Sequence, residues 1–318
     1  MQRLKSPRRK TERGAVSVMV ALLIIPLMGF AAISIDVAGM WAERQQLQAG
    51  ADAAALAIAQ DCSRNNCGTP SQTALTFASA NLNNGTATPI VITPALAPST
   101  GHVTVQNFGI SKHMFAPVLG INQKTVSAQS SANWAYPSGG TMVLPLTFSW
   151  CEFKAQTGGG VPSGTTERTV YLSKSSGTSC TGPSNNVVPG GFGWVDPDAG
   201  ACSKNSLISA VLTSSTGNSL PSGCSTADFQ AQQNKTVLLP IFDQAGGTGN
   251  NAWYKIYGYA AFKMTGYYFA GQYSWNPPCS GSERCIKGYF TKFVDLTEAY
   301  TSSPTAPQLG AAIVSLTQ

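Results

Sequence analysis

The sequence predicts an α+β protein: a long N-terminal transmembrane helix leads into a small α+β unit, followed by a β-rich, disulfide-containing module. Three observations predict this fold. Residues 14–35 form a run of 22 residues without a charged side chain. The rest of the chain holds most of the 32 glycines and 19 prolines, which favours short strands joined by turns. All eight cysteines follow the uncharged run.

Positive charge is concentrated at the N-terminus. Residues 1–13 carry six basic side chains and one acidic side chain, whereas the remainder of the chain carries 14 basic and 13 acidic side chains. The net charge of +6 therefore does not indicate a basic surface that would bind nucleic acid. We interpret residues 1–13 as a cytoplasmic basic tail that orients the segment after it.

The uncharged run predicts a transmembrane helix over residues 14–36. At about 1.5 Å per residue, it spans the roughly 30 Å hydrocarbon layer. The basic residues before it keep the N-terminus in the cytoplasm, so we expect a single pass through the cytoplasmic (inner) membrane, contact with membrane lipid and an extracytoplasmic body. Pro26 lies mid-span, where a kink is tolerated. The alternative is a cleaved secretory signal, whose apolar core is normally about 7–15 residues long.

The helix is expected to continue outside the membrane to about residue 60. Residues 37–60 contain no proline and many alanines, glutamines and leucines, which are good helix formers. One face carries small and apolar side chains, namely Leu47, Ala51, Ala54 and Ile58. This face either packs on the protein's own sheet or receives a second helix, since small side chains allow close approach.

Polar residues follow a distinctive order around this helix. Arg13-Gly14-Ala15 precedes the apolar run, Asp36 closes it, and Gln48 stands before the ADAAALA segment at 51–57. This order resembles the N-terminal segment of TadE/TadG-like proteins, assembly components of Flp (tight adherence, Tad) pili in bacteria. The resemblance implies a non-enzymatic single-pass membrane protein that assembles or anchors such pili. Its N-terminal helix would contact other pilus-assembly membrane proteins, and the candidate residues for that contact are Pro26, Asp36, Gln48 and Asp52.

Three features refine the resemblance. Segments of the C-terminal half, such as GGFGWVD and CIKGYF, are similar to those of actinobacterial members. The D-x-S-x-S metal motif that some TadG-type proteins carry in a von Willebrand A domain does not occur in this sequence, so no metal site is carried over. Arg13-Gly14-Ala15 is also similar to a prepilin cleavage site, although Met19 stands where prepilins usually have glutamate.

The remainder of residues 37–137 predicts a small α+β unit, similar in layout to pilins. We expect a helix at 71–82, a strand at 102–107, a brief helix within 112–121 and a β-prone run at 124–136. Turn-forming residues at 137–140 predict a domain boundary. Residues 138–318 then form the β-rich extracytoplasmic domain, a sandwich or barrel with expected strands at 142–150, 168–173, 235–243, 252–270 and 286–296.

An even number of cysteines on an exported body argues for disulfides. Local pairing would join Cys62 to Cys67, Cys151 to Cys180, Cys202 to Cys224, and Cys279 to Cys285, although the sequence alone allows many other connectivities. A structural zinc site is the alternative. It is disfavoured because the sequence contains no C-x₂-C pair.

No pattern in the sequence predicts catalysis or a cofactor. His102 and His113 are the two histidines, and neither a G-x-S-x-G motif nor a phosphate-binding loop occurs. Asp196 and Asp198 could pair as glycosidase carboxylates do, but Asp-Pro-Asp is typical of a turn. The alternative function is a membrane-tethered extracytoplasmic module that binds a cell-wall glycan or protein, supported by the aromatic residues between 253 and 290.

Overall fold

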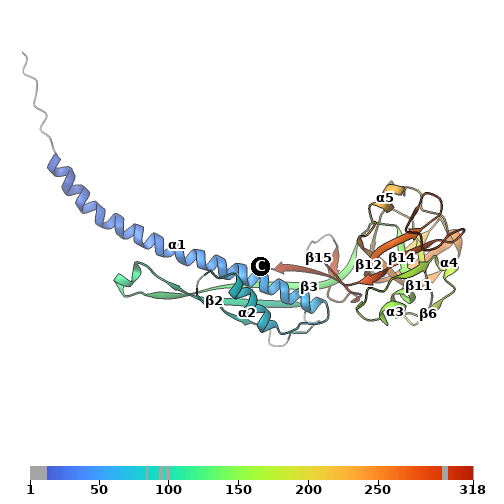
Figure 1. Ribbon diagram of the computed structural model, residues 1–318, viewed down its shortest axis with the longest axis horizontal. Helices are drawn as coiled ribbons and strands as arrows, with labels where there is room; N and C mark the ends of the chain where they lie inside the picture. The colour runs from blue at the N-terminus through green and yellow to red at the C-terminus, as the bar shows by residue number, and fades with distance from the viewer. Residues whose placement is uncertain (1–12, 84, 93–95, 98–100, 296–299, 318) are drawn as a thin grey trace, which may run out of the picture.

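The computed structural model describes residues 13–83, 85–92, 96–97, 101–295 and 300–317. The molecule is elongated, with helix α1 (Arg13–Ser63) extending from one end and a β-rich body at the other (Figure 1). The predicted class, an α+β protein with a long N-terminal apolar helix and a β-rich body, is confirmed. The basic tail expected at residues 1–13 lies, apart from Arg13, outside the described residues.

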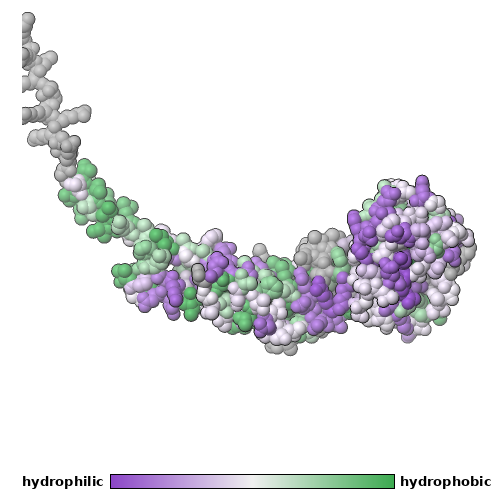
Figure 2. Space-filling view, in the orientation of Figure 1, coloured by the Kyte–Doolittle hydropathy of each residue, from purple (hydrophilic) through white to green (hydrophobic). Residues whose placement is uncertain are grey.

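Helix α1 is one uninterrupted helix of 51 residues, about 75 Å long at 1.5 Å per residue. It continues through Pro26 and ends close to the predicted residue 60. Side chains from Val16 to Ile35 are exposed, apart from Ala32, which is half-buried. By length and composition this is the one helix in the described part of the chain that could cross a membrane, with a mean hydropathy of 2.6 in its most apolar window. Figure 2 shows this length of α1 as hydrophobic surface.

The second half of α1 packs on helix α2 and on a first sheet (Figure 1). We call these elements together the membrane-proximal unit. Helix α2 (Pro70–Ala80) and strands β2 (His102–Lys112) and β3 (Gln123–Met142) contact α1. The sheet has the order β1-β2-β3-β17-β15. Its remaining members are β1 (Thr88–Val91), β15 (Phe293–Asp295) and β17 (Ala311–Thr317), while β9 (Lys204–Leu207) and β16 (Thr301–Ser303) pair with the far end of β3.

Strand β3 differs from its sequence-based expectation because it runs through residues 137–140, where we expected a boundary. The glycines there serve close packing between strands instead of a turn. A Cβ at Gly139 would lie 2.3 Å from the side chain of Leu207, and one at Gly140 would lie 2.1 Å from the ring of Tyr300. Strand β3 therefore belongs to both units, and the chain returns from the body to the proximal sheet through β15, β16 and β17.

The distal body is built on a second sheet of eight strands with the main order β5-β14-β12-β11-β4-β8. Strands β4 and β11 are parallel, and the other pairs of this sheet are antiparallel. Its strands are β4 (Leu146–Ser149), β5 (Arg168–Tyr171), β8 (Phe192–Trp194), β10 (Val211–Ser214), β11 (Thr236–Gly246), β12 (Ala252–Tyr268), β13 (Ser274–Trp275) and β14 (Cys285–Thr291).

Short elements that the sequence patterns do not predict complete the body. They are β6 (Ser179–Thr181), β7 (Val187–Pro189), α3 (Trp150–Thr157), α4 (Ser173–Ser176), α5 (Thr226–Gln230) and the 3₁₀ turn η2 (Gly249–Asn251). Helix α3 begins at Trp150, which we expected at the end of a strand. The Ser149 side chain accepts a hydrogen bond from the Cys151 N–H, and such an N-cap starts a helix.

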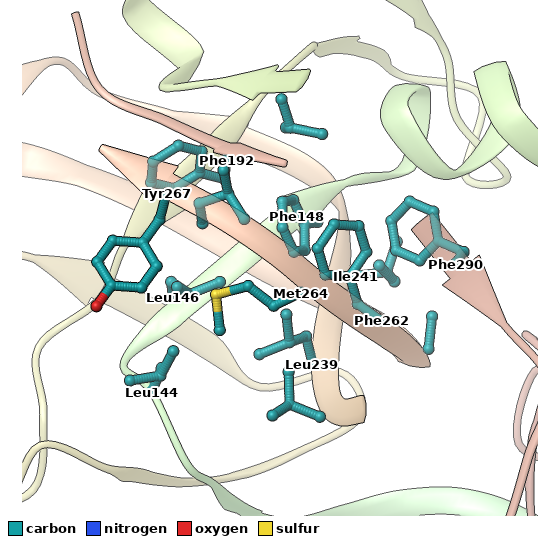
Figure 3. Close-up of a cluster of buried hydrophobic side chains, with 14 of the residues drawn as sticks. Leu144, Leu146, Phe148, Phe192, Leu239, Ile241, Phe262, Met264, Tyr267 and Phe290 are labelled. Atoms are coloured by element: carbon teal, nitrogen blue, oxygen red, sulfur yellow. The ribbon is translucent and has the colours of Figure 1, made fainter. Parts of the chain in front are cut away.

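Aromatic side chains dominate the core of the body (Figure 3). The rings of Phe148 and Phe262 lie 4.9 Å apart, and Phe290 stands edge-on to both. These contacts join β4, β12 and β14. Aromatic side chains bury large apolar areas, so the aromatic residues of β12 stabilise the fold.

Candidate functional site on the N-terminal helix

The small-residue face of α1 is buried inside the protein. Leu47, Ala51, Ala54 and Ile58 are all buried and pack against α2, β2, β3 and β17. Helix α2 approaches so closely that a Cβ at Gly50 would lie 3.1 Å from the Cα of Ala78. Of the two alternatives for this face, the structure shows packing on the protein's own sheet.

Gln48 and Asp52 also make contacts within the protein. The Gln48 amide donates hydrogen bonds to the Asp52 carboxylate at 2.8 Å and to the Gln129 carbonyl of β3 at 3.1 Å. A further contact, which sequence reasoning missed, comes from the buried Asn107, whose amide donates to the Leu47 carbonyl at 3.0 Å. These polar contacts position the second half of α1 on β2 and β3.

Asp36 is held by the hairpin that joins β2 to β3. Its two carboxylate oxygens accept hydrogen bonds from the backbone N–H groups of Met114 at 2.7 Å, Phe115 at 3.1 and 3.3 Å, and Ala116 at 2.7 Å. Hydrogen bonds to a charged acceptor are stronger than those between neutral groups. Asp36 therefore attaches the end of the hairpin to α1, at the residue where the apolar run ends.

The end of this hairpin, residues 113–122, is a compact turn. We expected a brief helix within 112–121, and the structure contains one 3₁₀ turn, η1 (Ala116–Leu119), with Pro117 in its first turn. Between η1 and α1 lies an apolar cavity of about 460 Å³, lined from both sides by residues such as Ile33, Met40, Phe115 and Leu119. The hairpin and the helix thus form one continuous apolar surface.

Pro26, the remaining helix-contact candidate, lies ten residues before Asp36 on the exposed length of α1. The structure brings Gln48 and Asp52 together and places Asp36 and Pro26 apart from them. The backbone around Gly29 is open, because a Cβ there would meet no atom within 4 Å. The exposed half of α1 is therefore the part free to contact lipid or another protein.

The eight cysteines lie at disulfide distance in four local pairs. The sulfur atoms are 2.14 Å apart in Cys62–Cys67, 2.12 Å in Cys151–Cys180, 1.98 Å in Cys202–Cys224 and 1.96 Å in Cys279–Cys285. The first pair closes the turn after α1, and the other three lie in the body. Each cysteine therefore has another cysteine as its partner.

Asp196 and Asp198 bind residues of strands β9 and β10 and Ser215, which follows β10. Partial burial acts to raise the pKa of Asp196, but hydrogen bonds from Ser215 and Thr213 outweigh it and hold that pKa below its ordinary value. The Asn205 N–H and the Lys204 ammonium lower the pKa of Asp198. A glycosidase acid needs a raised pKa, and neither carboxyl has one.

The histidines are not near these carboxylates. His102 begins β2, and His113 lies at the hairpin end beside α1. Among the described residues, no group of three or more histidine, cysteine, aspartate or glutamate side chains is arranged to hold a metal ion.

Removing the Asp36 carboxylate should free the hairpin end. In D36A, we expect the amides of Met114, Phe115 and Ala116 to exchange on the order of tenfold faster, because they lose their acceptors. Hydrogen exchange on the full chain in detergent measures this. The matched control is D61A, about 37 Å further along α1 at 1.5 Å per residue. Equal protection of these amides in D36A and D61A would contradict the role given to Asp36.

Comparison with known protein families gives a match that coincides with this helix. No curated protein and no solved structure matches the chain. Residues 14–61 match the Flp pilus-assembly TadE/G-like family. The matched segment covers nearly the whole of α1, both its exposed apolar half and its packed half. The N-terminal helix of this membrane-anchored protein is therefore the segment that is similar to the TadE/G-like Flp pilus-assembly family.

Proposed function

We propose that this protein takes part in the assembly or anchoring of Flp/Tad-type pili and that it does so without catalysing a reaction. The observation that carries the proposal is the family match over residues 14–61. That segment is one continuous helix, exposed and apolar in its first half and packed on a sheet in its second half. A helix of this kind can hold a folded body at a membrane surface while its first half remains in contact with the bilayer.

The proposed location is the cytoplasmic (inner) membrane, with the N-terminus inside and the body extracytoplasmic. Two observations support this orientation. Six basic residues precede or begin α1, and positive residues favour the cytoplasmic side. The cysteines of the body lie in pairs at disulfide distance, which suits an oxidising compartment.

The proposed partners are other membrane proteins of the pilus-assembly machinery. Because the small-residue face at 47–58 is buried on the protein's own sheet, we assign the partner contact to the exposed half of α1, residues 16–35. Pro26 and Gly29 lie in this half. Small or helix-distorting residues let a neighbouring transmembrane helix approach closely.

Deleting the gene should abolish or sharply reduce surface pili, and the full chain should restore them. The informative variant replaces residues 16–35 with an unrelated leucine-rich sequence of equal length, which preserves the anchor and removes the specific surface. We expect this variant to reach the membrane but fail to restore pili. Electron microscopy of cell surfaces measures the result, with membrane fractionation as the control for anchoring. Normal pili in the deletion strain would contradict the proposal.

A second candidate function is the recognition of a cell-wall glycan or protein by the body. The aromatic residues of 253–290 do not favour it, because Tyr259, Phe262 and Tyr267 are buried in the core. A cavity of about 570 Å³ favours this second function. The glycine-rich loop 245–250 and residues including Thr216 and Asn218 line the cavity. The Thr216 hydroxyl is buried there with no hydrogen-bond partner among the described residues.

A binding screen with cell-wall glycan fragments distinguishes the second candidate function from the pilus proposal. The screen uses the full chain in lipid nanodiscs, since β9, β16 and β17 of the body segment pair with β3. Specific binding that T216V removes would support the second function, particularly if the deletion strain makes normal pili. Equal signals from T216V and the unmodified chain would contradict it.

A further inference from the structure

The end of the β2–β3 hairpin exposes a dense group of apolar side chains. Within residues 114–121, five side chains are large, apolar and exposed: Met114, Phe115, Val118, Leu119 and Ile121. Val118 is 90% exposed and Leu119 is 74% exposed. A contiguous apolar patch of this kind marks an interaction surface in a folded protein. We call residues 114–121 the hairpin tip.

The hairpin tip lies beside the part of α1 that is expected to be in the bilayer. Its residues Val118, Leu119 and Ile121 line the same apolar cavity as Gly29 and Ala32 of α1. Gly29 precedes Asp36 by seven residues, or about 10 Å along the helix axis. The tip therefore reaches beyond Asp36 toward the N-terminus of α1 and lies alongside the last residues of the apolar run.

The backbone of the tip is suited to an apolar environment, where unpaired polar groups are costly. Asp36 accepts the N–H groups of residues 114–116. The N–H groups of residues 118, 120 and 121 donate to carbonyls within the turn, and that of His113 donates to Asn122. Pro117 has no N–H group. The apolar side chains of the tip are thus exposed, while these backbone N–H groups are paired with Asp36 or with carbonyls of the turn.

Residues typical of a membrane interface follow the tip. Lys112 and Lys124 lie on the two strands next to it, and both are exposed. Trp41 on α1 is also exposed and lies five residues beyond Asp36, about 7.5 Å along the axis. Lysine and tryptophan are favoured at the headgroup level, where the charged or polar end meets water and the remainder contacts acyl chains. Figure 2 shows hydrophilic surface beginning alongside the hairpin, where the exposed apolar length of α1 ends.

We propose that the hairpin tip, residues 114–121, inserts into the same leaflet of the bilayer as residues 29–35 of α1, so that lipid acyl chains cover its apolar side chains. The inserted depth of about 10 Å matches that of interfacial membrane segments. Contact at two points prevents α1 from rotating freely about its axis. The exposed half of α1 then presents a defined face to neighbouring membrane proteins.

The test places a benzophenone amino acid at position 118 of the full chain in nanodiscs of phosphatidylethanolamine and phosphatidylglycerol. Position 187 is the matched control, because Val187 is a similarly exposed valine at 75% on a strand of the distal body. Position 25, within the apolar run, is the positive control. After illumination, mass spectrometry measures lipid adducts at each position.

We expect lipid adducts at position 118 on the order of tenfold above those at position 187, with position 25 also high. Adding D36A should lower the yield at 118 and leave that at 25 unchanged. A yield at 118 equal to that at 187, or adducts at 118 to a second copy of the chain in place of lipid, would overturn the proposal. Neither result bears on the pilus proposal, which does not depend on the tip.

Discussion

Replacing Trp134 with alanine should lower the free energy of unfolding of the membrane-proximal unit by about 3–5 kcal/mol. Trp134 is buried on β3 and contacts the face of α1 that carries Ala54 and Ile58. Those neighbours are small or already packed, so the surrounding structure cannot collapse fully into the cavity that the substitution leaves. Hydrogen exchange of α1 residues 47–62, measured on the full chain in detergent, reports this loss.

The matched control for that substitution is W41A. Trp41 lies on the same helix but is exposed, and surface substitutions usually change stability by less than about 0.5 kcal/mol. We therefore expect W41A to leave the exchange of residues 47–62 unchanged. Equal effects of W134A and W41A would show that α1 is not docked through its small-residue face.

Removing the Cys151–Cys180 pair should destabilise the body more than removing the Cys279–Cys285 pair. The two pairs have sequence separations of 29 and 6 residues. In the chain-entropy account, closing loops of these sizes is worth about 3.6 and about 2.2 kcal/mol, respectively. Double alanine variants compared by urea unfolding, followed through the near-ultraviolet signal of the aromatic core, measure the difference.

The oxidation state of the cysteines is checked in the same experiment. Under strong reducing conditions, the unmodified protein should become at least as unstable as either variant, because all of its bridges are then opened. An unfolding midpoint that neither substitution nor reduction changes would show that these cysteines are not bridged in solution.

The hairpin tip and the segment that matches the pilus-assembly family, residues 14–61, meet at Asp36. Asp36 was selected from the sequence because it closes the apolar run, and the structure shows that its carboxylate fixes the hairpin tip. Replacing Asp36 is therefore expected to alter the proposed membrane contact of the hairpin tip while the apolar run of α1 stays in the bilayer. The effect of D36A on pili should therefore be measured together with the exchange rates of the hairpin amides in the same variant.

The sequence by itself determined the features that depend on local chemistry. The uncharged run of residues 14–35 has a length matched to a bilayer and predicts a spanning helix. The absence of proline after it, together with many alanines, predicts that the helix continues. Short separations between cysteines favoured the pairs that the structure shows at disulfide distance. Each of these inferences needs only residues that are close in the chain.

Tertiary structure decided the features that depend on distant residues. Nothing near Asp36 in the sequence indicates that backbone groups 78–80 residues later donate to it. Residues 137–140 have the composition of a turn, yet they are extended because they pair with β9 and β16. Glycine is needed there because Leu207 and Tyr300 occupy the space where side chains would be. Likewise, the return of residues 311–317 to β3 follows from strand pairing. Hydrogen bonding and packing between remote segments set these positions, and local propensity is too weak a preference to specify them.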